Sequence, residues 1–125
     1  MKDDKNEYIV GKIDKRVIKL LNLTIPDNTP IYIRQEKIKR IEVKHPADFK
    51  IYGKDISKII KSPDYIAKHL KNNSISYIKV YSEIGDYVLV AIRPSKSGKY
   101  YVRTLFIMAD EKVYKYWIKN ALISY

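Results

Sequence analysis

The sequence predicts an α+β domain in which a helical N-terminal half packs on a small antiparallel β-sheet, a meander, followed by a C-terminal helix. Three observations predict this class: helical apolar spacing in the first half, strand-like alternation in the second, and a final helical stripe. The 125 residues are 46% hydrophobic and include only four glycines, which suits one folded core. We expect residues 1–6 to be a flexible N-terminus and residues 7–125 to form a single domain.

The first predicted elements are short, and capping or turn residues mark their ends. Residues 7–13 predict a strand, and Asp14 then caps a helix whose Val17, Ile18 and Leu21 share one face. Residues 24–29 have turn chemistry, and residues 30–34 alternate as a strand does.

Residues 35–45 fit two templates. Ile38, Ile41 and His45 share a face at helical spacing, whereas Ile41, Val43 and His45 share one at strand spacing. Both templates place His45 at the buried side or its edge. Pro46 disfavours helical conformation at His45, so a regular element is expected to end there.

Two further helices are predicted before the meander. Residues 55–61 carry Ile56, Ile59 and Ile60 on one stripe. The run Ser62-Pro63-Asp64 then combines a capping hydroxyl, a first-turn proline and a first-turn acid, which predicts a helix that buries Ile66 and Leu70.

The second half changes to strand period. Residues 76–81, 86–93 and 100–108 predict three strands, joined by turns at 83–85 and 94–98. Asp110 then opens the C-terminal helix. Its predicted apolar stripe comprises Val113, Tyr116, Trp117 and Ala121.

The charge balance points to a polyanionic partner. Lys and Arg number 25 against 14 Asp and Glu, a formal net charge of +11. Nucleic acid is the leading candidate partner, and an anionic membrane surface or an acidic protein comes next. Lysines also serve simply to solvate a surface. The chain has no cysteine, no apolar segment long enough to span a bilayer and no signal peptide, so we expect a cytoplasmic protein without membrane contact.

Candidate chemistry does not require a metal or a cofactor. The two histidines and the scattered acids show no metal-ligand spacing, and no glycine-rich phosphate loop is present. RNA cleavage can proceed without metal, because the ribose 2′-hydroxyl is the nucleophile and the protein need only move protons and stabilise charge. One histidine, one or two Arg or Lys and a hydroxyl donor suffice.

The predicted meander offers such a set on one face. Tyr77, Lys79 and Tyr81 share a face of the first strand, and Arg93 lies opposite the apolar face of the second. On the third strand, Arg103 and Thr104 cannot both line one site without a bulge, and the sequence leaves open which does. From spacing alone, Lys79 and Arg93 are more often ordinary solvated residues, and His45 is more often a core-edge residue than a catalyst. His69 lies two residues before Lys71, and a solvated helix face is the best explanation for it.

Several stretches together resemble a known superfamily. The sequences KHPADF, ISKIIKSPDYI, YIKV, VLVAIRP and YYVRTLF, in this order over residues 30–108, resemble the nucleases named after barnase, EndoU, colicin D and RelE. The likeness is to the forms found in phages, mobile elements and polymorphic toxins. It implies an RNase-like domain, with helices against one face of a small antiparallel sheet and the active site on the exposed concave face.

The resemblance implies a metal-independent endoribonuclease acting on tRNA or another structured RNA through a 2′,3′-cyclic phosphate. Carried over by position, the implied catalytic residues are His45, Lys79, Arg93 and Thr104, with Tyr101 or Arg103 nearby as support in substrate binding. The tyrosines on the predicted meander face, Tyr77 and Tyr81, are expected to bind substrate by stacking on its bases. An immunity or antitoxin protein is an implied partner, and a toxin would be delivered into a target cell's cytoplasm. The alternatives are a non-catalytic RNA- or DNA-binding module and a small phage-type protein-interaction domain.

Overall fold

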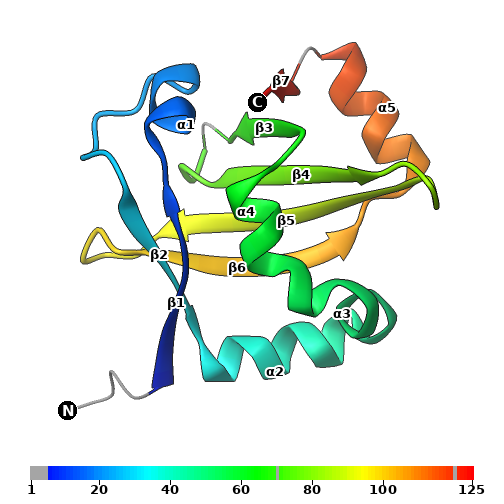
Figure 1. Cartoon of the computed structure of the whole chain (residues 1–125), viewed down its shortest axis with the longest axis horizontal. Coiled ribbons are helices and arrows are strands. Elements are labelled where there is room, and N and C mark those ends of the chain that lie inside the picture. Colours follow the sequence, from blue (N-terminus) through cyan, green and yellow to red (C-terminus); the bar gives the residue numbers. More distant parts are fainter. Residues whose placement is uncertain (1–5, 70, 120) are drawn as a thin grey trace.

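A computed structural model describes residues 6–69, 71–119 and 121–125. Residues 1–5 of the predicted flexible N-terminus and Leu70 of the predicted helix lie outside these residues. Within the described part, seven strands form one sheet in the order β1-β2-β6-β5-β4-β3-β7, with helices around it (Figure 1). None of the helices described is both long enough and apolar enough to cross a membrane.

The elements alternate along the chain. The strands are β1 (Glu7–Ile13), β2 (Thr29–Arg34), β3 (Tyr65–Lys68), β4 (Ile75–Tyr81), β5 (Asp86–Pro94), β6 (Tyr100–Ile107) and β7 (Ile123–Ser124). The helices are α1 (Lys15–Leu20), α2 (Gln35–Lys44), α3 (Pro46–Tyr52), the 3₁₀ turn η2 (Gly53–Asp55), α4 (Ile56–Lys61) and α5 (Asp110–Ile118).

The predicted fold class is wrong about the sheet. The first half is not a helical layer on a small antiparallel meander, because β1, β2 and β3 are themselves strands of the same sheet. The predicted antiparallel meander β4-β5-β6 forms only the centre of this seven-stranded sheet. β2 pairs with β6 in parallel, with Ile31 opposite Tyr100 and Tyr32 opposite Tyr101, so the sheet is mixed. Local periodicity identifies a strand but not its partner, and these partners lie far apart in the sequence.

The helix predicted from Ser62-Pro63-Asp64 is also wrong, because this segment leads into β3. The Asp64 side chain accepts a hydrogen bond from the Val80 backbone N–H (2.7 Å), and the Asp64 N–H donates to the Ile78 carbonyl (2.8 Å). Ile66 and Ala67, which point to opposite faces of the sheet, are both buried. A strand covered on both faces gains more from pairing with β4 and β7 than the local helix-start signal can offer.

Other local predictions are confirmed. The Asp14 carboxylate accepts from the Val17 N–H (2.9 Å) and caps α1, and α4 buries the predicted isoleucine stripe. Residues 35–44 are helical, and α2 ends at His45. Pro46 stops that helix as expected and is at the same time the first residue of α3, a position that proline favours.

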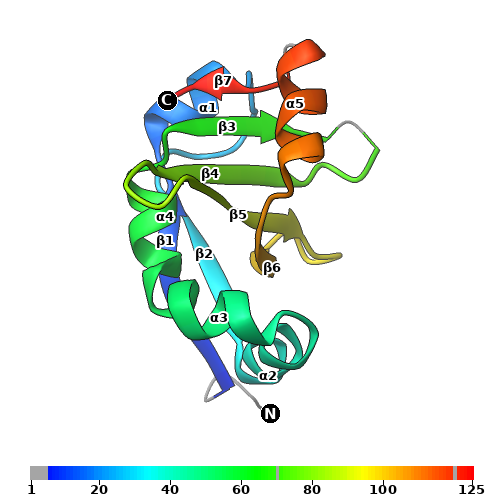
Figure 2. The same ribbon diagram turned by 90° about the vertical axis from the view of Figure 1, so that its right-hand side faces the viewer.

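The two faces of the sheet are covered differently. One face carries the main core, where α1 and α4 pack on residues such as Tyr77, Val90 and Leu105, and α4 crosses the sheet in Figure 1. On the other face, α5 covers a smaller cluster of Ile78 and Leu89 with its neighbours. Figure 2 shows α2 and α3 below the sheet and α5 to its right, beside β3 and β4. This second face is therefore the open one.

A single carboxylate joins three strands at one end of this face. Glu7 of β1 accepts hydrogen bonds from Lys99 Nζ (3.0 Å) and from the Tyr101 hydroxyl of β6 (2.8 Å), and Arg34 of β2 lies 3.6 Å away. The hydrogen bond from Lys99, with a further contribution from Tyr101, lowers the pKa of Glu7. The ionised carboxylate therefore stabilises the fold.

We expect Glu7→Gln to lower the melting temperature by roughly 2–4 °C at pH 7. Since the pKa of Glu7 is lowered from 4.5 by folding, its stabilising effect is complete above pH 4.5 and is lost as the pH falls. The difference between the wild type and the variant should therefore shrink below that pH. Thermal melts from pH 7 to pH 3 measure it, with Glu83→Gln, at an exposed turn, as the matched control. A constant difference across this range would contradict the assignment.

Candidate nucleic-acid groove

A β-bulge in β6 shapes the open face. Ile92 of β5 pairs with Val102 and Ala91 pairs with Thr104, so Arg103 is an extra residue without a partner on β5. The bulge turns two consecutive side chains to the same side, which a regular strand does not allow. Arg103 and Thr104 therefore line the same hollows, and the choice between them that the sequence left open does not arise.

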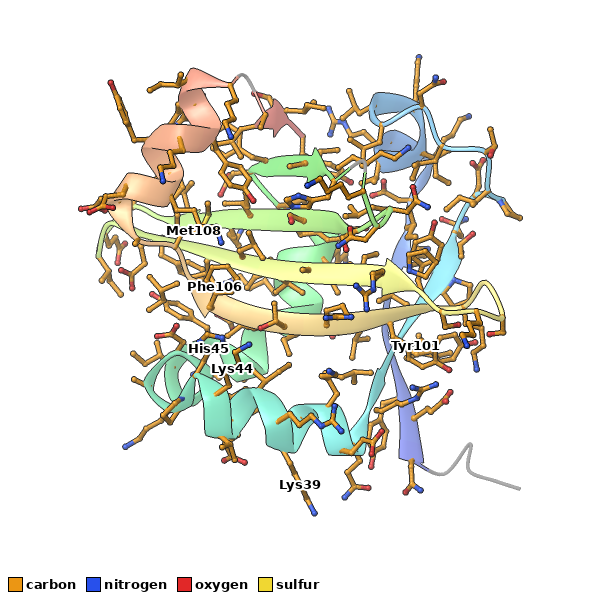
Figure 3. All side chains as sticks on the ribbon, turned by 180° about the vertical axis from the view of Figure 1, so that it is seen from behind. Lys39, Lys44, His45, Tyr101, Phe106 and Met108 are labelled. Atoms are coloured by element: carbon orange, nitrogen blue, oxygen red, sulfur yellow. The ribbon has the colours of Figure 1, made fainter. Side chains whose placement is uncertain are left out.

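His45 stands beside this strand at the junction of two helices. Its N–H donates to the Ile41 carbonyl (2.8 Å) in α2, and its carbonyl accepts from the Phe49 N–H (2.9 Å) in α3. The imidazole stacks on Phe106 of β6, with ring centroids 5.6 Å apart and an angle of 27° between the planes. His45 is half-buried, and Figure 3 shows it next to Phe106 at the edge of the sheet. His45 is thus accessible to solvent, and backbone hydrogen bonds to α2 and α3 fix its position on both sides.

The α3 helix is itself tied to β6. The Asp48 carboxylate accepts a hydrogen bond from the Ile107 N–H (2.9 Å), at the end of the strand that carries Phe106. The parallel pairing of β2 with β6 brings α2 alongside β6, because α2 begins directly after β2. These two connections hold the imidazole of His45 level with the bulged strand.

Two adjoining hollows lie over this face, and we call them together the groove. The larger, of about 530 Å³, is lined by Lys37, Arg40, Ile41, Lys44, His45, Arg103, Thr104, Phe106 and Lys112. The smaller, of about 220 Å³, is lined by His69, Asn72, Ser74, Ser76, Leu89, Ala91, Arg93, Arg103, Thr104, Phe106, Lys112 and Tyr116. Four residues line both hollows, so an extended ligand could pass from one hollow to the other.

The floor of the groove is a row of small side chains. Thr104, Ala91 and Ser76 lie directly opposite one another on β6, β5 and β4. The neighbouring row is bulky, because Phe106, Leu89 and Ile78 are paired in the same way. A trough one residue wide therefore crosses three strands.

The groove is strongly positive. Burial, followed by the nearby charge of Arg40, lowers the pKa of Lys37, and Arg93 and Lys44 add to this effect. The ion pairs found within the described residues all involve Glu7, which lies outside the groove. The cations of the groove therefore repel one another, and a bound anion would relieve that repulsion. Among the described residues, no three His, Asp or Glu side chains gather as a metal site would need.

The structure brings together only some of the predicted site residues. His45, Arg93, Arg103 and Thr104 line the groove. Tyr101 lies beyond one end of it, where its hydroxyl bonds Glu7 and the Arg34 guanidinium lies 4.1 Å from its ring centroid.

Lys79, Tyr77 and Tyr81 do not reach the groove, because they face the other side of the sheet. Lys79 Nζ donates to the Ser62 carbonyl (2.7 Å), Tyr77 is fully buried in the main core, and the Tyr81 hydroxyl donates to Asp55 (2.8 Å). The cause is the register: Lys79 pairs with Val88, so it shares the face of Val88 and not that of Arg93.

Sequence reasoning missed several groove residues. Lys37, Arg40 and Lys44 follow helical spacing, and the helical alternative for residues 35–45 would have placed them beside His45. The sequence predicts a solvated helix face for His69, but His69 follows β3 directly and lines the smaller hollow. The wrong helix assignment hid it.

One comparison with known proteins decides the family. A family model described as phage-Barnase-EndoU-ColicinE5/D-RelE like nuclease3 matches residues 8–115. The chain belongs to this nuclease family. No curated protein and no solved structure matches the chain significantly. The match extends on both sides of the stretch of about 30–108 that carries the resemblance, and it confirms the superfamily.

The span matched by the family model includes the elements of the groove. The matched span contains all of α2, the whole central meander and most of α5, which together supply the groove. A phage-type nuclease requires a polyanionic substrate, and the positive groove has the matching charge.

We expect Ala91→Leu to weaken nucleic-acid binding by about tenfold or more, because the larger side chain fills the middle of the trough floor. Fluorescence anisotropy with a labelled single-stranded oligonucleotide measures the affinity. The matched control is Ala109→Leu, at an exposed alanine that lines neither hollow. Equal affinities for Ala91→Leu and the wild type would show that the substrate does not lie on this floor.

Proposed function

We propose that this nuclease is an endoribonuclease that cleaves RNA without a metal ion and leaves a 2′,3′-cyclic phosphate. The observation that carries the proposal is the convergence of His45, Arg103 and Thr104 on one positive groove. These residues match what RNA cleavage requires, since RNA brings its own nucleophile. DNA lacks the 2′-hydroxyl and would need an activated water.

The reaction balances with groups in the groove. A base removes the proton of the 2′-hydroxyl, the 2′-oxygen forms a bond to phosphorus, and the bond from phosphorus to the 5′-oxygen breaks. The departing 5′-oxygen takes up a proton. In this scheme His45 serves in proton transfer at one of the two oxygens, from its position beside the bulged strand.

The second requirement is that the protein stabilise the negative charge that builds up on the scissile phosphate. Arg93 and Arg103 carry guanidinium groups that can bind phosphate oxygens through two hydrogen bonds at once. Thr104, at the end of the floor row, can donate a hydroxyl hydrogen bond to the same phosphate or orient His45. The α2 cations lie where neighbouring phosphates of the strand would pass. We propose no catalytic or binding role for Lys79, Tyr77 or Tyr81.

The proposed substrate is tRNA or another structured RNA, which places the activity in a cytoplasm: the producer's own, or a target cell's if the nuclease acts as a toxin. An inhibitor protein would then have to cover the groove or distort it. An acidic surface on such an inhibitor would complement the groove cations.

Incubation with total tRNA in EDTA tests the cleavage. We expect the wild type to generate cyclic-phosphate ends and His45→Ala to be at least about 10²-fold slower, because a proton-transfer group is lost. Lys58→Ala, on the exposed side of α4 across the sheet from the groove, should cleave at the wild-type rate.

Two outcomes would count against the enzyme. Intact RNA that still shifts on a gel, with affinity falling steeply as salt rises, would favour a non-catalytic binding module. Cleavage that EDTA abolishes would refute the metal-independent mechanism.

Expression in a bacterium tests the toxin role. Induced wild-type protein should arrest growth and deplete intact tRNA, whereas His45→Ala, expressed to the same level, should not. Lys58→Ala serves again as the control and should arrest growth as the wild type does. Normal growth with abundant, folded wild-type protein would contradict a general RNase toxin.

A further inference from the structure

The second histidine lies at the opposite side of the groove from the first. His69 follows β3, and its N–H donates to the Ser74 carbonyl (2.9 Å), which fixes the turn into β4. Its Nε2 lies 3.3 Å from the Ser76 hydroxyl and 3.5 Å from the Tyr116 hydroxyl of α5. His69 as a residue is exposed. Contacts from β4 and α5 thus orient the imidazole of an exposed residue that lines the smaller hollow.

We infer that His69 is a second catalytic residue, which transfers the proton on the side of the scissile phosphate opposite to His45. The inference rests on the proposed endoribonuclease function. It adds to that function the second proton-transfer residue that the reaction needs beside His45. Ser76 and Tyr116 act as positioning residues, because they contact the imidazole of His69 and hold its plane.

The chemistry requires two groups on opposite sides. In an in-line displacement, the attacking 2′-oxygen and the departing 5′-oxygen lie on opposite sides of the phosphorus. One group accepts the 2′-hydroxyl proton while the other gives a proton to the 5′-oxygen. A single imidazole on one wall of the groove reaches only one of these oxygens.

The floor row gives the spacing. Ser76, which contacts His69, and Thr104, which shares a hollow with His45, are separated only by Ala91. Three adjacent strands place the ends of this row about 9–10 Å apart. The methyl group of Ala91 leaves the space between them open. A phosphate above this residue would have one histidine toward each end of the row.

Neighbouring groups are less suited to the second transfer. Burial raises the pKa of Tyr116, so its hydroxyl keeps its proton more firmly and is a weaker acid. Arg93 and Arg103 stay charged and cannot cycle a proton. The Lys112 ammonium lies 4.7 Å from the centroid of the Phe106 ring, the ring on which His45 stacks. The titratable and charged side chains that line the hollow with His69 are Arg93, Arg103, Lys112 and Tyr116.

A substrate with a modified leaving group tests the inference. In RNA with sulfur in place of the bridging 5′-oxygen, the thiolate leaves without a proton, because a thiol is far more acidic than an alcohol. On ordinary RNA, His69→Ala and His69→Gln should each be at least about 10²-fold slower than the wild type. On the sulfur substrate, one of His69→Ala and His45→Ala should recover nearly the wild-type rate, and the other should stay slow.

The outcomes separate this inference from the proposed function. If the wild type leaves RNA intact, the endoribonuclease proposal fails and the inference with it. If the wild type cleaves and the folded His69 variants cleave as fast, only the inference fails. Equal recovery of both histidine variants, or of neither, would also overturn it. Circular dichroism and thermal melts of His69→Gln, whose amide nitrogen takes the place of Nε2 and can retain the hydrogen bond to Ser76, verify that the fold is intact.

Discussion

The β-bulge at Arg103 is the feature of the backbone on which the whole groove depends. Without the extra residue, Arg103 and Thr104 would point to opposite faces of β6, and either the guanidinium or the hydroxyl would be lost from the open face. The bulge also sets the register that aligns Thr104, Ala91 and Ser76 in one row. Arrangement of the site is therefore decided by strand pairing, before any side chain of the helices contributes.

Local signals in the sequence were informative wherever the structure is local. Asp14 as a cap, the isoleucine stripe of α4 and the alternation of the meander all correspond to observed elements. The errors concern long-range pairing. Asp64 has the chemistry of a helix start, yet its carboxylate binds the backbone of β4, and no local pattern reveals this.

The same distinction explains the candidate site. His45, Arg93 and Thr104 were accessible to sequence reasoning because residue type and family resemblance both marked them, and they line the groove. The sequence alone does not place Lys79 correctly, because its face depends on the register between β4 and β5, which puts it opposite Val88. The bulge that makes Arg103 and Thr104 neighbours on one face has no signature in the residues alone.

The parallel pairing of β2 with β6 has a consequence for biosynthesis. It closes a long loop of chain, from α2 through β5, and the closure of so long a loop costs conformational entropy. Until β6 has been synthesised and has docked beside β2, His45 has neither Phe106 to stack on nor Thr104 beside it. The nascent polypeptide thus has no assembled groove while it emerges next to the RNA of the translating ribosome. The groove is therefore present only in a chain whose β6 has been made and has docked beside β2.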